Sequence, residues 1–332
     1  MRRELIQILE GEKVHIQTHN FPDPDAIASA FALQRYIHYY GIESDICYDG
    51  RLERSNAKRM LENFGIQISP VTETGHLDQE DAVILIDSQN LNANVTDIGG
   101  KKVACIDHHP VFAEYDYLYR DIRKVGSCAS IVASYFKADG IPIEPNVAAA
   151  LAYAIKMDTA DFTRGTTQTD TEMFSYLFEY ADWKRVQYMY NNTLELADLR
   201  AYEAAIQSIE VYDKVGFAYI PFDCQPALIA IISDFVKALD EVNIAVIYAM
   251  QEDGVRFSVR SEEDKVNVGT LLKNILAGIG DGGGHPAMAG GFISKESAER
   301  LGEKLHHMIQ ERFMQGIREM RNSGQTALCD NQ

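Results

Sequence analysis

Short apolar runs alternate with amphipathic segments through the first half of the chain. Two largely apolar runs, 82–87 and 102–107, predict strands that are buried on both faces, as in a parallel sheet. Amphipathic segments at 25–40 and 127–138 have the apolar spacing of helices, and Ser127 stands at a position typical of a helix cap. This alternation predicts an α/β fold with a parallel sheet in the N-terminal domain.

The pattern changes in the second half of the chain. Runs at 243–250 and 255–260 predict two strands, and Glu252-Asp253-Gly254 between them predicts a hairpin turn. A glycine-rich segment from Asp281 predicts a loop that leads into a strand at 287–293. A long helix is expected after that strand, so we expect a smaller domain of mixed α/β structure.

These patterns divide the chain into four segments. Residues 168–211 have a helical pattern without a strand, and their charges are typical of an exposed helix. We therefore expect a first domain at 1–190, a linker helix at 191–211, a second domain at 212–321 and a frayed polar tail at 322–332.

The charge balance narrows the range of partners. The chain has 332 residues, and its 49 acidic and 31 basic side chains give a net charge of −18. A protein that coats long nucleic acid needs a broad basic surface, so long duplexes and anionic membranes are poor candidates. A small anionic ligand held by a few local cations or metal ions remains compatible with this charge.

Apolar runs and cysteines give two further expectations. The clearest apolar run, 148–155, is too short to span a membrane, and the N-terminus does not have the pattern of a signal peptide, so we expect a cytoplasmic protein. The five cysteines are widely spaced and form no Cys-x-x-Cys pair. A disulfide framework or a thiolate zinc site is therefore not expected, and any metal would be held by histidine and carboxylate.

Acids and imidazoles follow the predicted strands, where α/β sheets bind ligands. They are His19, Asp23 and Asp25 at and after the end of a predicted strand at 13–19, Asp87 at the end of the run 82–87, Asp107, His108 and His109 at the end of the run 102–107, and Asp158 after the predicted helix at 147–157. Two divalent ions about 3.5–4 Å apart need a bridging carboxylate between them. Histidine with carboxylate suits Mn²⁺ or Zn²⁺ better than Mg²⁺. Taken alone, Asp25 could be a helix cap, and His108 could be a core histidine. The prediction of a metal site therefore rests on the whole set of residues.

The second domain has a separate candidate site. The glycines at 282–284 allow backbone N–H groups to approach an anion closely, and His285 follows them. Arg256, Ser258 and Arg260 alternate along a predicted strand and share one face, and an arginine fork matches a phosphate. A simple loop beside a solvated strand face would explain the same residues.

These motifs resemble those of a known family. The segments His19-x3-Asp23-x-Asp25-Ala26, Asp87, Asp107-His108-His109 and Asp158-Thr159 resemble the four motifs of the DHH phosphoesterases. Arg260-Ser261 and Gly282-Gly283-Gly284-His285 resemble the DHH-associated C-terminal domain. The resemblance covers nearly the whole chain, and the overall length is similar to the NrnA-type branch. That branch degrades very short RNAs and often removes the 3′-phosphate of pAp.

The resemblance implies a role for each matched residue. A metal-binding catalytic domain and a substrate-binding domain would face each other across a cleft. One Mn²⁺ would be held by His19, Asp23 and Asp87, and the other by Asp25, Asp87, His108 and Asp158, with Asp87 as the bridge. His109 would act near the scissile phosphate as a ligand or proton donor, and Asp107 would orient the site. The implied substrate-binding residues are Arg260, Ser261, Gly283, Gly284, His285 and Arg164.

The implied reaction is hydrolysis of short oligonucleotides such as nano-RNA and pApA, or of pAp, by a hydroxide that bridges two metal ions. The expected partners are short RNA or DNA oligonucleotides or small bisphosphorylated nucleotides, with no long duplex and no membrane, and a homodimer is left open. Two residues depart from the family pattern. Asp281 stands where a glycine is common, and Asp161 is more acidic than usual, although Arg164 nearby could compensate or contact substrate.

Three alternatives remain. A RecJ-like single-strand exonuclease shares both domains but usually adds an oligonucleotide-binding domain. An inorganic pyrophosphatase shares the first domain but is expected to carry a lysine- and arginine-rich signature where this chain has Gly-Gly-Gly-His. A non-catalytic nucleotide-binding regulator would keep the metal site without turnover.

Overall fold

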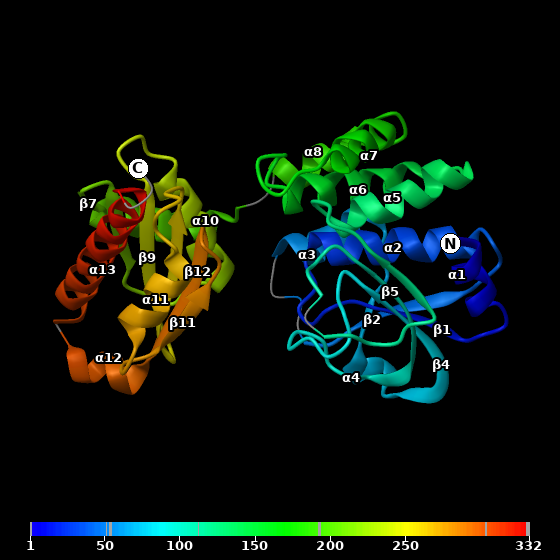
Figure 1. The fold of residues 1–332 in the computed structure, drawn as a ribbon, viewed down its shortest axis with the longest axis horizontal. Helices are drawn as coiled ribbons and strands as arrows, with labels where there is room; N and C mark the ends of the chain where they lie inside the picture. Colours follow the sequence, from blue (N-terminus) through cyan, green and yellow to red (C-terminus); the bar gives the residue numbers. More distant parts are fainter. Residues whose placement is uncertain are drawn as a thin grey trace. The chain divides into compact units, whose positions relative to one another are not determined.

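The protein is described from a computed structural model that covers residues 2–50, 52, 55–111, 113–191, 194–302 and 304–329. The chain divides into two compact units, Met1–Thr193 and Leu194–Gln332. Figure 1 shows both units as layers of helices on a sheet.

The N-terminal unit contains a six-stranded sheet in the order β3-β2-β1-β4-β5-β6. All neighbouring strands in this sheet run parallel. The strands are β1 (Val14–Gln17), β2 (Ser44–Tyr48), β3 (Ser69–Pro70), β4 (Leu77–Ile86), β5 (Gly99–Asp107) and β6 (Tyr119–Ile122). The predicted α/β fold with a parallel sheet is confirmed.

Helices pack on this sheet around one hydrophobic core. They are α1 (Arg2–Leu9), α2 (Pro24–His38), α3 (Ser55–Phe64), α4 (Val71–Thr74), α5 (Cys128–Asp139), α6 (Pro145–Asp158), α7 (Gln168–Phe178) and α8 (Trp183–Asn191). Helix α6 is buried along 147–155, because α2, α5, α7 and α8 surround it. Ser127 caps α5 by accepting a hydrogen bond from the Ser130 amide, as the sequence predicts.

The C-terminal unit contains a mixed sheet in the order β11-β12-β10-β9-β8-β7. Strands β8 and β9 are parallel and the other neighbours are antiparallel. The strands are β7 (Glu210–Tyr212), β8 (Val215–Ile220), β9 (Ile244–Gln251), β10 (Gly254–Ser261), β11 (Asp281–Gly284) and β12 (Met288–Ser294). The predicted hairpin at 252–254 joins β9 to β10.

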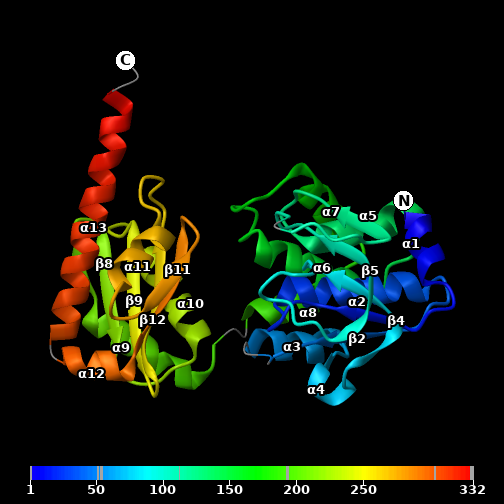
Figure 2. The same ribbon diagram turned by 60° about the horizontal axis from the view of Figure 1, so that its bottom comes forward.

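Helices cover both faces of the C-terminal sheet. They are α9 (Leu199–Ser208) after the short 3₁₀ helix at Leu196–Asp198, α10 (Pro226–Lys237), α11 (Val268–Leu276), α12 (Lys295–Leu301) and α13 (Lys304–Cys329). Helices α11 and α13 share one core with the sheet, and α9 and α10 share a second core on the other face. Figure 2 shows α13 along one side of this unit.

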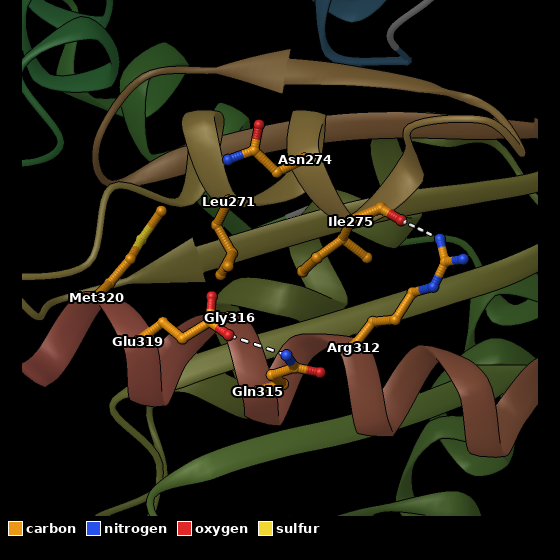
Figure 3. Close-up of a pocket in the computed structure, with 8 residues that line it drawn as sticks. All are labelled: Leu271, Asn274, Ile275, Arg312, Gln315, Gly316, Glu319 and Met320. Carbon is orange, nitrogen blue, oxygen red and sulfur yellow. Dashed lines mark hydrogen bonds between the residues drawn. The ribbon is translucent and has the colours of Figure 1, made fainter.

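Helix α13 lies against α11 and leaves a surface cavity of about 550 Å³ beside them (Figure 3). Arg312 of α13 donates a hydrogen bond to the carbonyl of Ile275 in the last turn of α11. A Cβ at Gly316 would stand 2.6 Å from a methyl group of Leu271, so glycine lets the two helices approach.

Two expectations about the second half are wrong in detail. The glycine-rich segment 281–284 is strand β11, which pairs with β12 through a turn closed by His285 and Met288. The expected linker helix is not exposed along its length, because Ala201 and Ala205 of α9 are buried against the C-terminal sheet.

The C-terminal helix also differs from its expected form. It is interrupted near Gly302, whose positive φ of 52° ends α12 before α13 begins. Residues 322–329, expected as part of a frayed tail, continue α13, and 330–332 lie outside the described residues. Within the described ranges, no helix is both long enough and apolar enough to cross a membrane.

Candidate metal centre and substrate-binding residues

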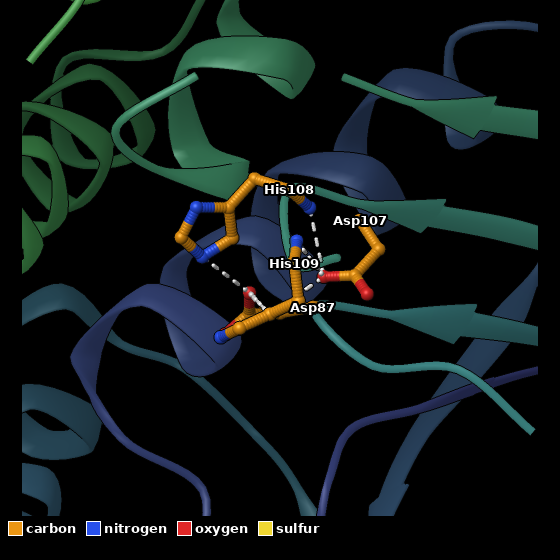
Figure 4. A group of neighbouring side chains, drawn as sticks. All are labelled: Asp87, Asp107, His108 and His109. Carbon is orange, nitrogen blue, oxygen red and sulfur yellow. Dashed lines mark hydrogen bonds and ion pairs between the residues drawn. The ribbon is translucent and has the colours of Figure 1, made fainter. Parts of the chain in front are cut away.

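The predicted metal ligands lie at the carboxyl ends of neighbouring strands. His19 follows β1, and Asp23 caps α2 by accepting hydrogen bonds from the amides of Asp25 and Ala26. Asp87 follows β4 and His108 follows β5, whose pairing in the sheet places both strand ends together. Asp158 ends α6. Figure 4 shows Asp87, Asp107, His108 and His109 gathered at this edge.

Two groups of donor atoms form within this cluster. In the first, His19 Nε2 lies 3.7 Å from Asp87 Oδ2 and 3.9 Å from Asp23 Oδ1. In the second, His108 Nε2 lies 3.3 Å from Asp87 Oδ1, 3.4 Å from Asp158 Oδ2 and 3.8 Å from Asp25 Oδ2. Most of these distances are too long for hydrogen bonds. They are close to the spacing of roughly 3–3.5 Å between ligand atoms that each lie about 2.1 Å from one ion.

Asp87 belongs to both groups through different oxygens. Oδ2 faces His19 and Oδ1 faces His108. Oδ1 is buried, and no described residue forms a hydrogen bond of acceptable geometry with it. Burial of the side chain raises the pKa of Asp87. A buried carboxylate oxygen without a hydrogen bond is costly unless a cation binds it, so the geometry fits a ligand that bridges two metal ions.

Asp25 is held differently from Asp87. Its Oδ2 accepts a 2.7 Å hydrogen bond from the Cys128 amide, and its Oδ1 accepts 2.9 Å and 3.3 Å bonds from the Ala129 amide and the Ser29 hydroxyl. Both amides belong to the first turn of α5, which fixes the rotamer of the carboxylate. Burial, together with the charges of Asp87 and Asp158, raises the pKa of Asp25 well above its usual value.

The electrostatics of the cluster favour bound cations. Burial opposes charge on His19 and His108, yet the surrounding carboxylates raise the pKa of His19 to about 9 and that of His108 to about 11. Burial raises the pKa of Asp158 to about 6, although His108 opposes this shift. Four carboxylates face only two imidazoles here, so divalent cations would relieve the repulsion among the acids.

Asp107 and His109 form a pair beside the predicted metal ligands. Asp107 Oδ1 accepts a 2.9 Å hydrogen bond from His109 Nδ1 and further bonds from the amides of His108 and His109. Burial alone would raise the pKa of Asp107, but these hydrogen bonds lower it below its usual value. The hydrogen bond that His109 donates to Asp107 raises the pKa of His109, whose side chain is half exposed. Asp107 therefore orients this imidazole and favours its charged form.

Gln89 is a residue of this site that the sequence did not indicate. Its Nε2 donates a 2.7 Å hydrogen bond to Asp107 Oδ2 and a 3.2 Å bond to the carbonyl of His109. It holds the loop after β5 against the loop after β4. In the sequence, only its position two residues after Asp87 could have indicated that Gln89 belongs to this site.

Arg164 lies next to Asp158, a predicted metal ligand. Its Nη2 donates a 2.7 Å hydrogen bond to the Asp158 carbonyl and lies 3.7 Å from the carboxylate. Asp161, the unusual acid in this loop, pairs with Lys156 at 2.9 Å. The extra negative charge in this loop is therefore balanced by Lys156, and Arg164 lies against Asp158.

The predicted phosphate-binding residues of the C-terminal unit gather at one corner of its sheet. Arg260 lies opposite Met288, and the amide of Ser261 donates to the carbonyl of Ala287 in the turn after His285. His285 is exposed, and its carbonyl accepts from the amide of Gly269 at the start of α11. The structure thus brings Arg260, Ser261, Gly284 and His285 together, whereas Gly283 lies farther along β11.

Arg260 is already paired within the protein. Its Nε donates a 2.8 Å hydrogen bond to Asp234 of α10, and its Nη1 lies 3.2 Å from the Ser258 hydroxyl. The Arg260 side chain is 15% exposed, whereas that of Asp234 is 59% exposed. Asp234 is a second residue that the sequence did not indicate, because nothing in the pattern of α10 relates it to β10.

Comparison with protein families assigns each of the two units to a known domain family. The profile of the DHH family N-terminal domain matches residues 13–155, and that of the DHHA1 domain matches residues 213–311. The chain carries a DHH domain followed by a DHHA1 domain. The DHH match contains all the proposed metal ligands except Asp158, and the DHHA1 match contains the corner from Arg260 to His285. The resemblance to this family is confirmed, and the NrnA-type branch stays a prediction.

Two curated relatives and one solved structure are similar to this chain. An uncharacterized protein of Methanocaldococcus jannaschii is 27% identical over 309 residues, which cover 92% of this chain and 63% of that protein. A probable manganese-dependent inorganic pyrophosphatase of Streptococcus mutans is 30% identical over 158 residues, or 47% of this chain and 51% of its own length. The chain therefore spans less than two thirds of either relative. An exopolyphosphatase-related protein from Bacteroides fragilis shares the fold, with a TM-score of 0.74, 16% identity and 95% and 98% of the two chains covered.

Proposed function

We propose that this protein is a two-metal phosphoesterase that hydrolyses short oligonucleotides, such as nano-RNA and pApA, or the bisphosphorylated nucleotide pAp. One observation carries the proposal above the others. The two oxygens of Asp87 face two separate groups of donors, and one of these oxygens is buried without a hydrogen bond. This arrangement supports a carboxylate that bridges two cations.

The proposed ligands divide between two ions. His19, Asp23 and Asp87 would hold one ion, and Asp25, Asp87, His108 and Asp158 would hold the other. Bound divalent ions supply an activated water and neutralise charge on phosphoryl oxygens. The mixture of histidine and carboxylate favours Mn²⁺, and one relative is named a probable manganese-dependent enzyme.

His109 has the position and charge of a group that acts on the phosphate. Its Nδ1 donates to Asp107, so Nε2 is the ring nitrogen left to contact a substrate oxygen. The pKa of His109 is raised by that hydrogen bond, which favours an imidazolium that donates a proton at Nε2. Asp107 holds the ring and its tautomer, and Gln89 holds Asp107.

The side chains of the DHHA1 domain favour a substrate that has a second anionic group. Arg260, Ser261, Gly284 and His285 offer a guanidinium, a hydroxyl, backbone and an imidazole at one corner, which suit a phosphate remote from the bond that is cut. The net charge of −18 disfavours long nucleic acid, which needs an extended basic surface. Short oligonucleotides and pAp can offer a second phosphate, and they do not need an extended basic surface.

Hydrolysis by the purified chain with Mn²⁺ tests the proposal in one panel of substrates. The panel contains pAp, pApA, a five-nucleotide RNA, a long single-stranded DNA and pyrophosphate. The expected result is turnover of the first three. Preference for long DNA would support a RecJ-like exonuclease, and preference for pyrophosphate would support the activity named for the streptococcal relative. Nucleotide binding without turnover of any substrate would indicate a regulator.

A further inference from the structure

Asp170 is a buried carboxylate in the first turn of α7, and its hydrogen bonds divide into two pairs. In the first pair, Oδ2 accepts bonds of 2.7 Å from both the amide and the hydroxyl of Thr167. An acid in the first turn that reaches back to the residue before a helix is a common capping arrangement. The start of α7 therefore explains these two bonds.

The second pair of hydrogen bonds reaches a distant part of the chain. Oδ2 of Asp170 also accepts a 2.8 Å bond from the Gly126 amide, and Oδ1 accepts a 2.6 Å bond from the Ser130 hydroxyl. Burial alone would raise the pKa of Asp170, but the bonds from Ser130, Thr167 and Gly126 lower it, which favours the charged form. Hydrogen bonds to a charged carboxylate are stronger than neutral ones, so Asp170 anchors the segment 125–130 at two points.

The anchored segment supports two of the proposed metal ligands directly. His108 Nδ1 donates a 3.2 Å hydrogen bond to the Val125 carbonyl, which orients the ring so that Nε2 faces the other donors. The first two amides of α5 donate to the two oxygens of Asp25. Both contacts come from residues within two positions of an anchor, Gly126 or Ser130.

Gly126 brings the same segment against the neighbour of a third proposed ligand. A Cβ at Gly126 would stand 2.7 Å from the Thr159 methyl group and 2.8 Å from Asp170 Oδ2. Thr159 is fully buried and follows Asp158 at the end of α6. A residue without a side chain lets the backbone approach both neighbours this closely. The segment that Asp170 anchors therefore adjoins the end of α6 as well.

We propose that Asp170 is a positioning residue for one of the two metal ions. By anchoring the segment behind them, it holds Asp25, His108 and Asp158 at the spacing that one ion requires. The ligands proposed for the other ion alone lie in the turn between β1 and α2, which no hydrogen bond of Asp170 reaches among the described residues. This inference rests on the proposed function, because it takes two metal ions as given, and it assigns them different supports.

Titration of the full chain with Mn²⁺ by isothermal calorimetry, without substrate, tests this role. The wild type is expected to bind two ions. Asp170→Ala should weaken one of the two sites about tenfold or more, the loss usual for residues that orient metal ligands, and should change the other site much less. Asp170→Asn keeps an acceptor oxygen for Gly126 and Thr167, so it should restore most of the lost affinity. If Asp170 only caps α7, its removal would lower stability and leave the Mn²⁺ affinity unchanged.

Two hydroxyl variants form a matched pair around Asp170. Ser130→Ala and Thr167→Val each remove one hydroxyl that donates to this carboxylate, at 2.6 Å and 2.7 Å. Ser130 belongs to the anchored segment, whereas Thr167 belongs to the start of α7. Ser130→Ala should weaken the same Mn²⁺ site several-fold, and Thr167→Val should leave both sites unchanged. This pair keeps the role testable if Asp170→Ala does not fold.

Amide hydrogen exchange in EDTA gives a measurement that needs no metal. In Asp170→Ala, the amides of Cys128 and Ala129 should exchange several-fold faster relative to the core of the same domain, because their segment has lost its anchors. Asp81→Ala is the control, since it removes another buried carboxylate, which is bonded to Lys13. It should lower the melting temperature and leave both the relative exchange of these amides and the Mn²⁺ affinity unchanged.

The outcomes separate this role from the proposed function. Unchanged Mn²⁺ affinity in folded Asp170→Ala, or an equally large loss in Asp81→Ala, would overturn the positioning role. Equal losses for Ser130→Ala and Thr167→Val would do the same. Hydrolysis of pApA is measured on the same wild-type preparation. Two bound ions without turnover would remove only the proposed function, turnover with unchanged Mn²⁺ affinity in Asp170→Ala would remove only the positioning role, and fewer than two ions bound by the wild type would remove both.

Discussion

The two candidate sites of this protein are built from opposite materials. In the DHH domain, buried carboxylates and imidazoles crowd one edge of a parallel sheet, and the pKa values of Asp25, Asp87 and Asp158 are all raised, with burial the largest cause. In the DHHA1 domain, the candidate site is the corner from Arg260 to His285, and its guanidinium, that of Arg260, is already paired with Asp234. The first site carries an excess of negative charge, whereas the charge of Arg260 in the second site is already neutralised within the protein.

This difference predicts different responses to mutation. A site that depends on charge loses its cations when one bridging ligand is removed, so the effect should be nearly complete. A site whose arginine is already neutralised should lose only part of its affinity when that arginine is removed.

Asp87→Asn is expected to cause the largest loss of activity. Because Asp87 faces both groups of donors, we expect kcat/KM with Mn²⁺ to fall by about 10³-fold or more, since a bound metal supplies several kcal/mol of transition-state stabilisation. Its Oδ1 has no hydrogen-bond partner among the described residues, so the amide should be tolerated in the fold. Steady-state kinetics on pApA and thermal unfolding measure the two effects.

Metal binding supplies the control for this variant. Saturating Mn²⁺ should raise the melting temperature of the wild type, because a ligand at about 100 times its Kd stabilises by about 2.7 kcal/mol. The melting temperature of Asp87→Asn should be nearly the same with Mn²⁺ and with EDTA. A variant that keeps both the Mn²⁺-dependent increase and the turnover would refute the bridging role.

Asp25→Asn tests whether the proposed metal ligands are equivalent in their effect on stability. Both oxygens of Asp25 accept backbone N–H groups from α5, so an amide NH₂ must face one of these donors. We expect a loss of about 2 kcal/mol in the free energy of unfolding in EDTA, or about 4–8 °C in melting temperature. Asp87→Asn in EDTA is the matched control, and equal melting temperatures for the two variants would contradict this distinction.

The sequence predicts the DHH domain better than the DHHA1 domain for a physical reason. Parallel strands such as 82–86 are buried on both faces, so each one can be recognised in the sequence as a continuous apolar run. Because these strands run in the same direction, the residues that follow them lie at the same edge of the sheet. Strand β4 nevertheless begins at Leu77, which pairs with Gly99, and the polar stretch between Leu77 and Ala82 is an irregularity of the pairing that no apolar pattern indicates.

Long-range partners could not be predicted from local patterns. The amides that fix Asp25 lie more than a hundred positions away at the start of α5, and Asp234 of helix α10 contacts Arg260 of strand β10. The glycine segment 281–284 was predicted as a loop because glycine has a low strand propensity, yet α11 packs closely on its face. Only the packed structure separates Gly282, which has a packing role, from Gly283.

Arg260→Ala tests the second site through substrate dependence. If Arg260 binds a remote phosphate, KM for pAp and pApA should rise about tenfold, a loss of about 1.4 kcal/mol that is modest for hydrogen bonds to a charged group. A phosphodiester with no second phosphate should be affected much less. Arg300→Ala, which removes an exposed arginine of α12, is the control. Equal losses for both kinds of substrate would argue against a phosphate-binding role.

Asp234→Asn should have the smallest effect and the opposite sign. The Asp234 side chain is more than half exposed, and exposed ion pairs contribute about 0.2–1 kcal/mol, so releasing Arg260 should lower KM for pAp only about two- to threefold. The gain should decline as salt is added, because screening weakens the original pair. A rise in KM would show instead that Asp234 positions the guanidinium of Arg260. In that case, the affinity lost through misalignment of the guanidinium would exceed the affinity gained by freeing its charge. Measuring KM at two salt concentrations for wild type, Asp234→Asn and Arg260→Ala distinguishes an arginine restrained by its neighbour from one oriented by it.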